Sequence, residues 1–565
     1  MTTISPLNPL VHPTHSSKLT RRNFISLLAI GGGAAALAAC QAGDLADEPP
    51  TMITSTPEPP TPEPPTLEPT RPPTATLTST PHVAAEELAR RLPRWRGFNL
   101  LEKFTLSENA PYREWDFDFI AHWGFDFVRL PTDYRIWTGK TGEYLEKPLQ
   151  EIDQAIQWGR SRGIHMNLCL HRAPGYCVNP PLEKLDLWSD DSGGEEARRQ
   201  FAAQWRMFAA RYKGIPSQEL SFDLLNEPGD IETVRYARAV KTAVEAIRLE
   251  DPERLIIADG LYWGRKPVTE LISLGIAQST RGYDPMQISH YRAEWIEGSK
   301  DWPEPRWPVP LFPNLYLYGD EKPEFQTPLV LKGDFSEARQ ISLQVGQVSH
   351  QANLVIRADD QVILEKWFEP GPGEGEWKKS EFRSEWNIYQ AVYDQWVSVD
   401  LPAGTQTIRI EVSRGDWITL TSLRITPFGE SASGVLEIQP GSVEWGIQQE
   451  ELTVDVQGNL IPSNGGQFDR QSLWRDLVEP WVELASAGVG VHVGEWGAYS
   501  STPHVVTLAW MKDCLENWKQ AGFGWALWNL RGSFGILDSS RADVSYEEFQ
   551  GHQLDRQMLE VLLQG

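Results

Sequence analysis

Short apolar runs alternate with amphipathic stretches of helical period from residue 95 to the end of the chain. This alternation predicts parallel strands joined by helices, because a parallel pair needs a long crossover connection. Eight runs read as strands, at residues 97–101, 125–131, 164–171, 220–226, 255–259, 286–291, 489–494 and 524–528. Eight such units close into a (β/α)8 TIM barrel, so we expect an α/β fold of this class.

The interval between the sixth and seventh predicted strands is too long for a connection within a barrel. Residues 313–429 alternate apolar and polar side chains between Gly-, Pro- and Asp-rich turns, without a helical period. This texture predicts an antiparallel β-sandwich inserted after strand six. The barrel then consists of residues 94–312 and 430–565. Residues 435–456 also read as strand and fit either part.

The N-terminal region reads as an export segment followed by a tether. Residues 20–25 (TRRNFI) resemble a twin-arginine signal, and the apolar run after them is too short to span a bilayer. Residues 37–40 (LAAC) resemble a bacterial lipobox, which implies lipidation of Cys40, although an ordinary cleaved signal is the alternative. The export signal, 1–40, precedes a Pro-, Thr- and Glu-rich linker, 41–93, that is expected to stay extended. We therefore expect an exported protein, lipid-anchored to a bacterial cell envelope.

Composition narrows the classes of partner. The formal net charge is −25 and no basic cluster stands out, which argues against a nucleic-acid partner. Besides Cys40 there are three cysteines, none with the spacing of a metal site, although Cys169 and Cys177 are close enough in sequence to form a disulfide. The 24 tryptophans can supply both core residues and platforms for sugar rings. We expect a monomer with no bound metal.

Two carboxylates stand at the ends of strand-like runs. Glu227 lies in the segment SFDLLNEP, and Glu495 lies in VHVGEWG. The C-terminal ends of barrel strands are where such folds place their chemistry. Hydrolysis of a glycosidic bond needs two groups of this kind, a proton donor for the leaving oxygen and a nucleophile or base. Further polar and aromatic residues follow the other predicted strands: Arg129, His171, Asn226, His290, Tyr291 and Trp528.

In this order, the residues at the strand ends resemble glycoside hydrolase family 5, the cellulase-like group of retaining β-glycanases. That family has an Arg after strand two, a His after strand three and Asn-Glu-Pro after strand four. It has a His and a Tyr after strand six, a Glu after strand seven and a Trp after strand eight. The resemblance covers about residues 94–565, apart from the insert, and all positions in order are more specific than the tripeptide alone.

The resemblance implies a role for each residue. Glu227 is expected to be the general acid/base, with a pKa raised by burial and by Glu495, which is expected to be the nucleophile. Arg129 and Tyr291 are expected to hydrogen-bond Glu495, and Asn226 to hold the sugar 2-hydroxyl. The remaining candidates are expected to bind substrate: His171 and His290 through hydroxyl groups, Trp528 as the floor under the cleaved sugar, and Trp263 and Trp496 as further aromatic contacts.

The implied reaction is hydrolysis of β-glycosidic bonds in a β-glucan or β-mannan by double displacement, with no metal or organic cofactor. Retention requires the two carboxyl groups to lie roughly 5 to 5.5 Å apart. An endoglucanase, a mannanase and an exo-glucanase all fit, and an inactive glycan-binding surface lipoprotein is the alternative of another class. Reducing-sugar release separates the two classes.

The chain departs from the family pattern at two places. The family's Leu-Asp-Leu-His before the strand-three His is Leu-Cys-Leu-His here, with Cys169 in place of the Asp. The insert is not general in the family, and a strand-to-helix loop emerges on the catalytic face. Its aromatics suggest either a carbohydrate-binding module or a wall of the cleft, and the alternative is a spacer without a ligand; the candidates are Trp367, Trp377, Trp386, Trp396 and Trp417.

Overall fold

The computed structural model describes residues 84–296, 298–429, 434–441, 445–463 and 466–565. The predicted export signal with Cys40, and the predicted linker up to residue 83, lie outside the described residues. Among the described residues, no helix combines the length and apolarity needed to cross a membrane.

The described end of the predicted linker belongs to the barrel. Residues 85–90 form helix α2 (Ala85–Arg90), and its Leu88 and Ala89 are buried. These side chains join Phe127, Leu255 and other apolar residues of the strands in one cluster. The chain therefore enters the barrel as a helix rather than as an extended tether.

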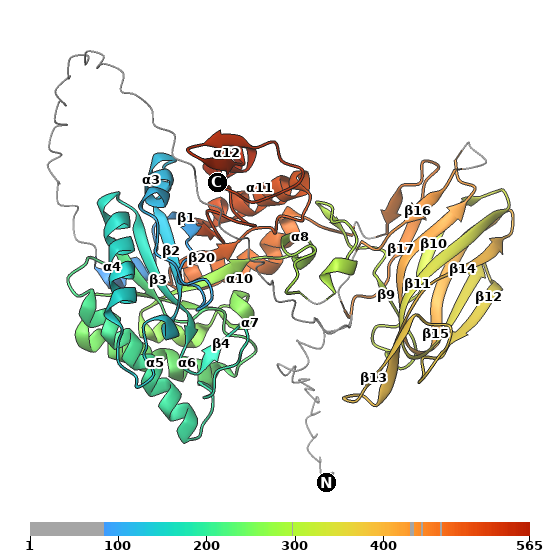
Figure 1. The fold of residues 1–565 in the computed structure, drawn as a ribbon. Coiled ribbons are helices and arrows are strands. Elements are labelled where there is room, and N and C mark those ends of the chain that lie inside the picture. The colour runs from blue at the N-terminus through green and yellow to red at the C-terminus, as the bar shows by residue number, and fades with distance from the viewer. Residues whose placement is uncertain (1–83, 297, 430–433, 442–444, 464–465) are drawn as a thin grey trace, which may run out of the picture.

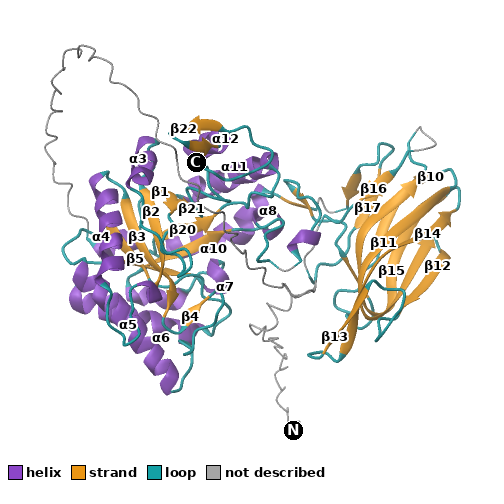
Figure 2. Ribbon diagram, in the orientation of Figure 1, coloured by secondary structure: helices purple, strands orange, loops and turns teal. Residues whose placement is uncertain are grey.

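Eight parallel strands form a closed barrel, which confirms the predicted fold (Figures 1 and 2). They are β1 (Arg96–Asn99), β2 (Phe127–Asp133), β3 (His165–Ala173), β5 (Leu220–Asp223), β6 (Leu255–Asp259), β7 (Ala277–Gly282), β20 (Val491–Trp496) and β21 (Gly524–Leu527). Each strand pairs with the next, and β1 pairs with both β2 and β21.

Helices surround the strands and bury apolar faces against them (Figure 2). The main ones are α3 (Glu114–His122), α4 (Glu146–Ser161), α5 (Ser192–Arg211), α6 (Thr233–Glu250), α10 (Glu479–Ser486), α11 (His504–Ala521) and α12 (Arg556–Gln564). The connection after β6 holds only the short α7 (Leu261–Gly264) and a 3-10 turn, Thr269–Leu274. The outward-facing strand residues and these helices make one continuous core.

The prediction of the sixth strand at residues 286–291 is wrong. The sixth strand is β7, and residues 286–289 form the short helix α8 (Met286–Ser289) in the loop that follows it. Strand β7 reads AQSTRG and lacks the large apolar residues of its neighbours. Its outward-facing Gln278 and Thr280 instead bond the backbone of Val268 and Gly264. The apolar pattern therefore pointed to a segment several residues too late.

A β-domain is inserted between β7 and β20, as predicted, and stands beside the barrel (Figure 1). Its strands are β9 (Tyr316–Tyr318), β10 (Leu329–Phe335), β11 (Arg339–Ala358), β12 (Gln361–Phe368), β13 (Lys379–Arg383), β14 (Ile388–Leu401), β15 (Thr405–Thr426), β16 (Leu436–Ile438), β17 (Glu451–Val454) and β18 (Leu460–Pro462). The pairs are antiparallel except β10 with β17, which is parallel.

The two longest strands, β11 and β15, give the β-domain its layered shape. They pair along most of their length, and their register shifts at several bulges. On its other edge, β11 pairs with β14 over residues 339–349 and with β12 over residues 352–358. Bulges bend a strand, so the sheet curls around its own apolar core, which includes Leu343, Leu354 and Ile410.

The β-domain extends beyond the expected boundary at residue 429. Strand β16 pairs with β15, and β17 pairs with β10, so residues 436–438 and 451–454 belong to this domain. At its base, β8 (Val309–Pro310) pairs with β19 (Gln467–Phe468). This pair, hereafter the neck, holds together the two crossings between barrel and β-domain.

Candidate active site

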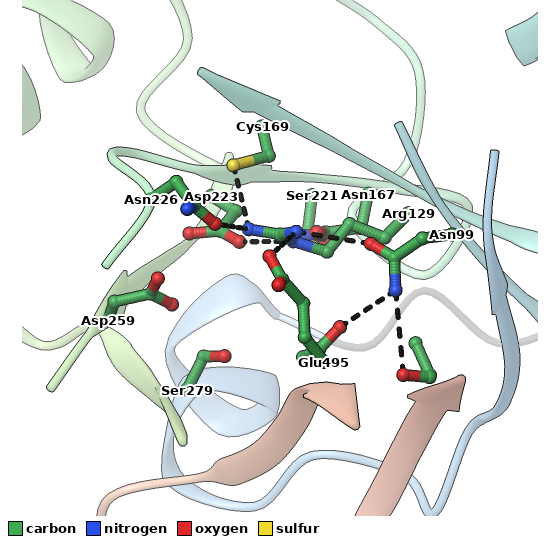
Figure 3. A network of polar contacts seen from close by, with 12 residues as sticks. Asn99, Arg129, Asn167, Cys169, Ser221, Asp223, Asn226, Asp259, Ser279 and Glu495 are labelled. Carbon is green, nitrogen blue, oxygen red and sulfur yellow. Dashed lines mark hydrogen bonds and ion pairs between the residues drawn. The ribbon is translucent and has the colours of Figure 1, made fainter. Parts of the chain in front are cut away.

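Glu495 lies at the C-terminal end of β20 and is 3% exposed. Its Oε1 accepts a hydrogen bond of 2.5 Å from Nη1 of Arg129 and lies 3.3 Å from Nη2 of Arg281. Its Oε2 accepts one of 3.3 Å from the hydroxyl of Tyr283. These three donors come from β2, from β7 and from the residue that follows β7. The Glu495 side chain thus points into the barrel, where Figure 3 shows it beside Arg129.

Arg129 is fixed by every nitrogen of its guanidinium (Figure 3). Nε donates to Asp223 at 2.8 Å and Nη1 to Asn99 at 3.1 Å. Nη2 donates to Asn226 Oδ1 and to the sulfur of Cys169, both at 2.9 Å. A guanidinium held in this way cannot follow a moving carboxylate, so Arg129 sets the position of the Glu495 carboxylate.

Glu227 follows β5 and adopts a left-handed backbone conformation, with φ of 49°. This conformation is costly for a residue with a Cβ. Two hydrogen bonds hold it: its N–H donates to Asp259 at 2.8 Å, and its carbonyl accepts from the Tyr176 hydroxyl at 2.7 Å. The backbone is thus bent at this residue to aim the carboxyl group at the barrel mouth.

The electrostatics of Glu227 suit a proton donor. Burial and, second, the negative charge of Glu495 raise the pKa of Glu227 to about 8. The ion pair with Arg281, whose Nε lies 3.2 Å from Oε1 of Glu227, acts in the opposite direction. The Glu227 side chain keeps 16% exposure, so a leaving group can reach it. A carboxyl group with this pKa is protonated at neutral pH.

Arg281 is a site residue that sequence reasoning missed. It lies on β7, it is 2% exposed at its side chain, and it contacts both Glu227 and Glu495. Its other nitrogens bond both oxygens of Asp259 and, at 2.9 Å, Oδ1 of Asn226. One guanidinium therefore connects the two carboxyl groups. The signal available was Arg-Gly-Tyr at 281–283, in the place where the family pattern has a His and a Tyr.

Asn226 and His171 lie next to this network. Oδ1 of Asn226 accepts from both arginines, which leaves Nδ2 as its donor. In the described part of the chain, Nδ2 makes no hydrogen bond of normal geometry, and it approaches the ring of His171. Burial and the charge of Arg129 lower the pKa of His171 well below its usual value, so its imidazole is neutral. The Nε2 atom of His171 lies 3.2 Å from Nδ2 of Asn179, so both side chains belong to the buried polar network around Arg129.

Trp528 and His290 border the site with partly exposed rings. The Trp528 ring packs edge-on against Phe104 at 5.5 Å and lies 6.0 Å from the His171 ring. The His290 ring lies 5.1 Å from the Tyr283 ring, and its Nδ1 is 2.7 Å from the Ser289 hydroxyl. Burial, and second Arg265, lower the pKa of His290 to about 4.

The predicted contact of Tyr291 with Glu495 is wrong, because Tyr283 makes it. Burial raises the pKa of Tyr283 well above its usual value, so its phenol stays protonated and donates. Tyr291 follows helix α8. The guanidinium carbon of Arg292 lies over the Tyr291 ring, 4.9 Å from the centre of that ring. This error follows directly from the misplaced sixth strand.

Trp496 is a core residue rather than a contact for substrate. It is 0% exposed and packs against Trp518 at 4.7 Å and Trp525 at 5.5 Å. Neighbouring residues of a strand point to opposite faces, and Glu495 points into the barrel, so Trp496 must face the helices. Trp263 does lie near the site. Its backbone N–H donates to the Pro228 carbonyl, and its part-buried ring packs near Gly229.

Two groups of candidate residues remain: the cysteines of the barrel and the tryptophans of the β-domain. Cys169 and Cys177 are both free thiols. Burial raises the pKa of Cys169 well above its usual value, so a neutral thiol stands beside Arg129.

In the β-domain, Trp417 is buried and Trp377 is half-buried, whereas Trp367, Trp386 and Trp396 are exposed. Glycan binding by the exposed three stays a prediction.

Comparisons with known proteins agree with this arrangement. A family model described as Cellulase (glycosyl hydrolase family 5) matches residues 93–285. Endoglucanase C of Acetivibrio thermocellus is 30% identical over 192 residues, which are 33% of this chain and 54% of that protein. Cellodextrinase A of Ruminococcus flavefaciens is 26% identical over 191 residues, 32% of this chain and 54% of that protein. The chain thus spans about half the length of these curated relatives.

A crystal structure described as a glycoside hydrolase is similar to this fold. It has a TM-score of 0.53 and 27% identity, and the match covers 83% of this chain and 99% of that chain. The segment matched by the family model contains Arg129, Asn226 and Glu227 and ends before Glu495. The place of Glu495 in the site therefore rests on its contacts with Arg129 and Tyr283.

Proposed function

We propose that this protein, whose barrel is a glycoside hydrolase family 5 domain, hydrolyses β-glycosidic bonds of a poly- or oligosaccharide by retaining double displacement. One observation carries the proposal. Glu227 has the pKa of a proton donor, and Glu495, which contacts the same Arg281, is surrounded by donors that stabilise a carboxylate.

In the first step, Glu227 gives its proton to the glycosidic oxygen. The bond between that oxygen and the anomeric carbon breaks, and an oxygen of Glu495 bonds to the anomeric carbon from the opposite face. The leaving sugar departs as an alcohol with the proton of Glu227. Nδ2 of Asn226 is placed to hold the 2-hydroxyl as positive charge develops on the ring, and Arg129 keeps the attacking carboxylate in position.

The second step uses the coupling between the two carboxyl groups. Formation of the ester removes the negative charge of Glu495, which is one cause of the raised pKa of Glu227. The pKa of Glu227 therefore falls, and its carboxylate takes a proton from water as that water attacks the anomeric carbon. The ester bond breaks and Glu495 is regenerated. Two inversions return the β configuration.

A β-glucan is the proposed substrate class, because the relatives are named endoglucanases and a cellodextrinase. β-Mannan remains the second candidate. The test is product analysis on β-1,4-glucan, β-1,3-glucan and β-1,4-mannan, with proton NMR of the first product. We expect reducing sugar of β configuration from at least one of them. Initial release of the α-anomer would overturn retention, and binding without release by the wild type would favour the inactive glycan-binding alternative.

The pH dependence follows from the state of Glu227. The protonated form is active in the first step, so kcat/KM is expected to be retained below the pKa of about 8 and lost as the pH rises through it. Initial rates on a soluble oligosaccharide at constant ionic strength measure this limb. The Glu227→Gln variant should lose it, because an amide does not titrate. A loss of kcat/KM that is already complete below pH 6, or one that the variant shows unchanged, would contradict the assignment.

We also propose that the protein is exported and lipid-anchored through Cys40. The proposal rests on the TRRNFI and LAAC segments and on the Pro-rich linker in the sequence. Radioactive palmitate fed to a bacterial host that expresses the full chain should label the wild type and not the Cys40→Ala variant. Equal labelling of both, or of neither, contradicts the anchor.

A further inference from the structure

Five aromatic residues line one side of the site and are here called the aromatic wall: Tyr283, His290, Trp295, Tyr499 and Phe534. They come from three loops on the catalytic face. Three of them follow β7, Tyr499 follows β20 and Phe534 follows β21. Segments far apart in sequence thus meet at one surface, which local chain geometry alone does not produce.

The aromatic wall is continuous from the nucleophile outward. The Tyr283 hydroxyl contacts Glu495, and the Tyr283 ring lies 5.1 Å from His290 and 6.3 Å from Phe534. Trp295 comes next: its ring centroid lies 6.1 Å from that of His290 and 6.2 Å from that of Phe534. A sugar chain that leaves the carboxylates on this side passes Tyr283 first and Trp295 after it.

Trp295 is the most exposed ring of the aromatic wall, whose other members are buried or half-buried. Phe534 is 3% exposed, whereas Trp295 is 58% exposed. Even so, the indole contacts three rings, including an edge-on contact with Tyr499 at 4.9 Å. One edge of the indole is therefore held while the rest is open to solvent. A core role does not account for more than half exposure, and a freely moving surface tryptophan does not account for three ring contacts.

We propose that Trp295 is the platform for a sugar ring of the glycan beyond the ring held between Glu227 and Glu495. The flat indole matches the apolar C–H face of a β-linked pyranose, and the neighbouring rings fix its orientation in advance. Trp295 lies between α8 and the neck, so the segment that leads into the β-domain supplies this binding site. The inference rests on the proposed function and adds a second subsite to it.

The test measures kcat/KM over a series of β-gluco-oligosaccharides of increasing length, including the shortest that the wild type cleaves. Trp295→Ala should lower kcat/KM about tenfold for the long members, the factor that corresponds to about 1.4 kcal/mol of stacking. The shortest substrate, which does not reach Trp295, should react as in the wild type. Trp295→Tyr should recover most of the loss, because it restores a flat ring.

The matched control is Trp115→Ala. Trp115 is 50% exposed and lies on α3, on the side of the barrel away from the β-domain (Figure 1). This change should leave kcat/KM unaffected at every length. An equal loss by Trp295→Ala for short and long substrates would show a merely structural role, and no loss at any length would overturn the platform.

A binding measurement separates this proposal from the proposed function. Calorimetric titration of the same oligosaccharides into Glu495→Gln, and into Glu495→Gln with Trp295→Ala, reports affinity without turnover. Weaker binding of only the long members by the double variant supports the platform. If the wild type releases no sugar while this difference persists, the hydrolytic function fails and the platform stands. If hydrolysis occurs but the affinities are equal, the platform fails alone.

Discussion

Replacement of Glu495 by glycine is expected to lower kcat/KM on a β-glucan by at least about 1,000-fold, because the attacking group of the first step is removed. Arg129 should stay in place, since Asp223, Asn99 and Asn226 hold it independently of Glu495. The measurement is the initial rate of reducing-sugar release, with thermal unfolding as the check on folding. Glu495→Gln keeps the shape of the side chain and should show a loss of similar size.

The product formed with azide makes this prediction specific to a nucleophile. In Glu495→Gly, azide can occupy the space of the lost carboxylate and attack from the same face, with an activated β-glycosyl fluoride as donor. Glu227 is unchanged in this variant. One inversion gives an α-glycosyl azide, which NMR identifies. Recovery of activity without an azide product, or a β-azide, would contradict the nucleophilic role of Glu495.

Replacement of Glu227 by alanine is expected to lower kcat/KM about 10²- to 10⁴-fold on natural β-glucans, the usual contribution of a general acid. The size should depend on the leaving group. A dinitrophenyl glycoside departs without a proton, so its first step should remain fast and the glycosyl–Glu495 ester should accumulate as a burst. Kinetics on aryl glycosides with leaving groups of different pKa measure this trend.

Azide again distinguishes the role. In Glu227→Ala it needs no general base, so it should react with the glycosyl–Glu495 ester and give a β-glycosyl azide after two inversions. Wild-type protein under the same conditions serves as the control and should give only the hydrolysis product. A loss that is equal for good and poor leaving groups would show that Glu227 is not the acid.

The barrel strands could be predicted where apolar residues that face the helices are followed by a polar residue that faces the barrel interior. In β5, Leu220 and Phe222 face the helices while Asp223 faces Arg129, so the apolar run and the polar end appear together in the sequence. In β20, Val493 faces the helices and Glu495 faces the barrel interior, because a bulge separates these two residues. Both catalytic candidates were recognisable because each lies at the end of such a run.

Strand β7 could not be recognised in this way. The outward positions of β7 hold Gln278 and Thr280, whose polar groups are satisfied by backbone of the preceding loop. That compensation depends on tertiary structure and leaves no apolar signal. The role of Arg281 was hidden for the same reason, since its partner Asp259 lies on the adjacent strand β6 and only the register of the two strands brings them together.

Tryptophan roles were equally hard to assign from sequence. Trp496 and Trp528 each come at or just after a strand end, yet one is fully buried and the other is partly exposed. The difference arises at the bulge between Val493 and Glu495, where the register of β20 shifts against both neighbouring strands. A shift of one residue reverses which side chains face the barrel interior. Gly494, the extra residue at the bulge, is the sequence signal that could have indicated it.

The neck brings the two ends of the β-domain together, so the domain can be removed there as one piece. Because Pro310 is paired with Gln467 in an antiparallel ladder, the entry and exit of the β-domain are one strand spacing apart, about 4.8 Å. A two-residue turn spans that distance in an ordinary hairpin. The β-domain is thus a cassette with adjoining ends, and its excision at the neck would leave β7, α8, Trp295 and β20 in the shortened chain.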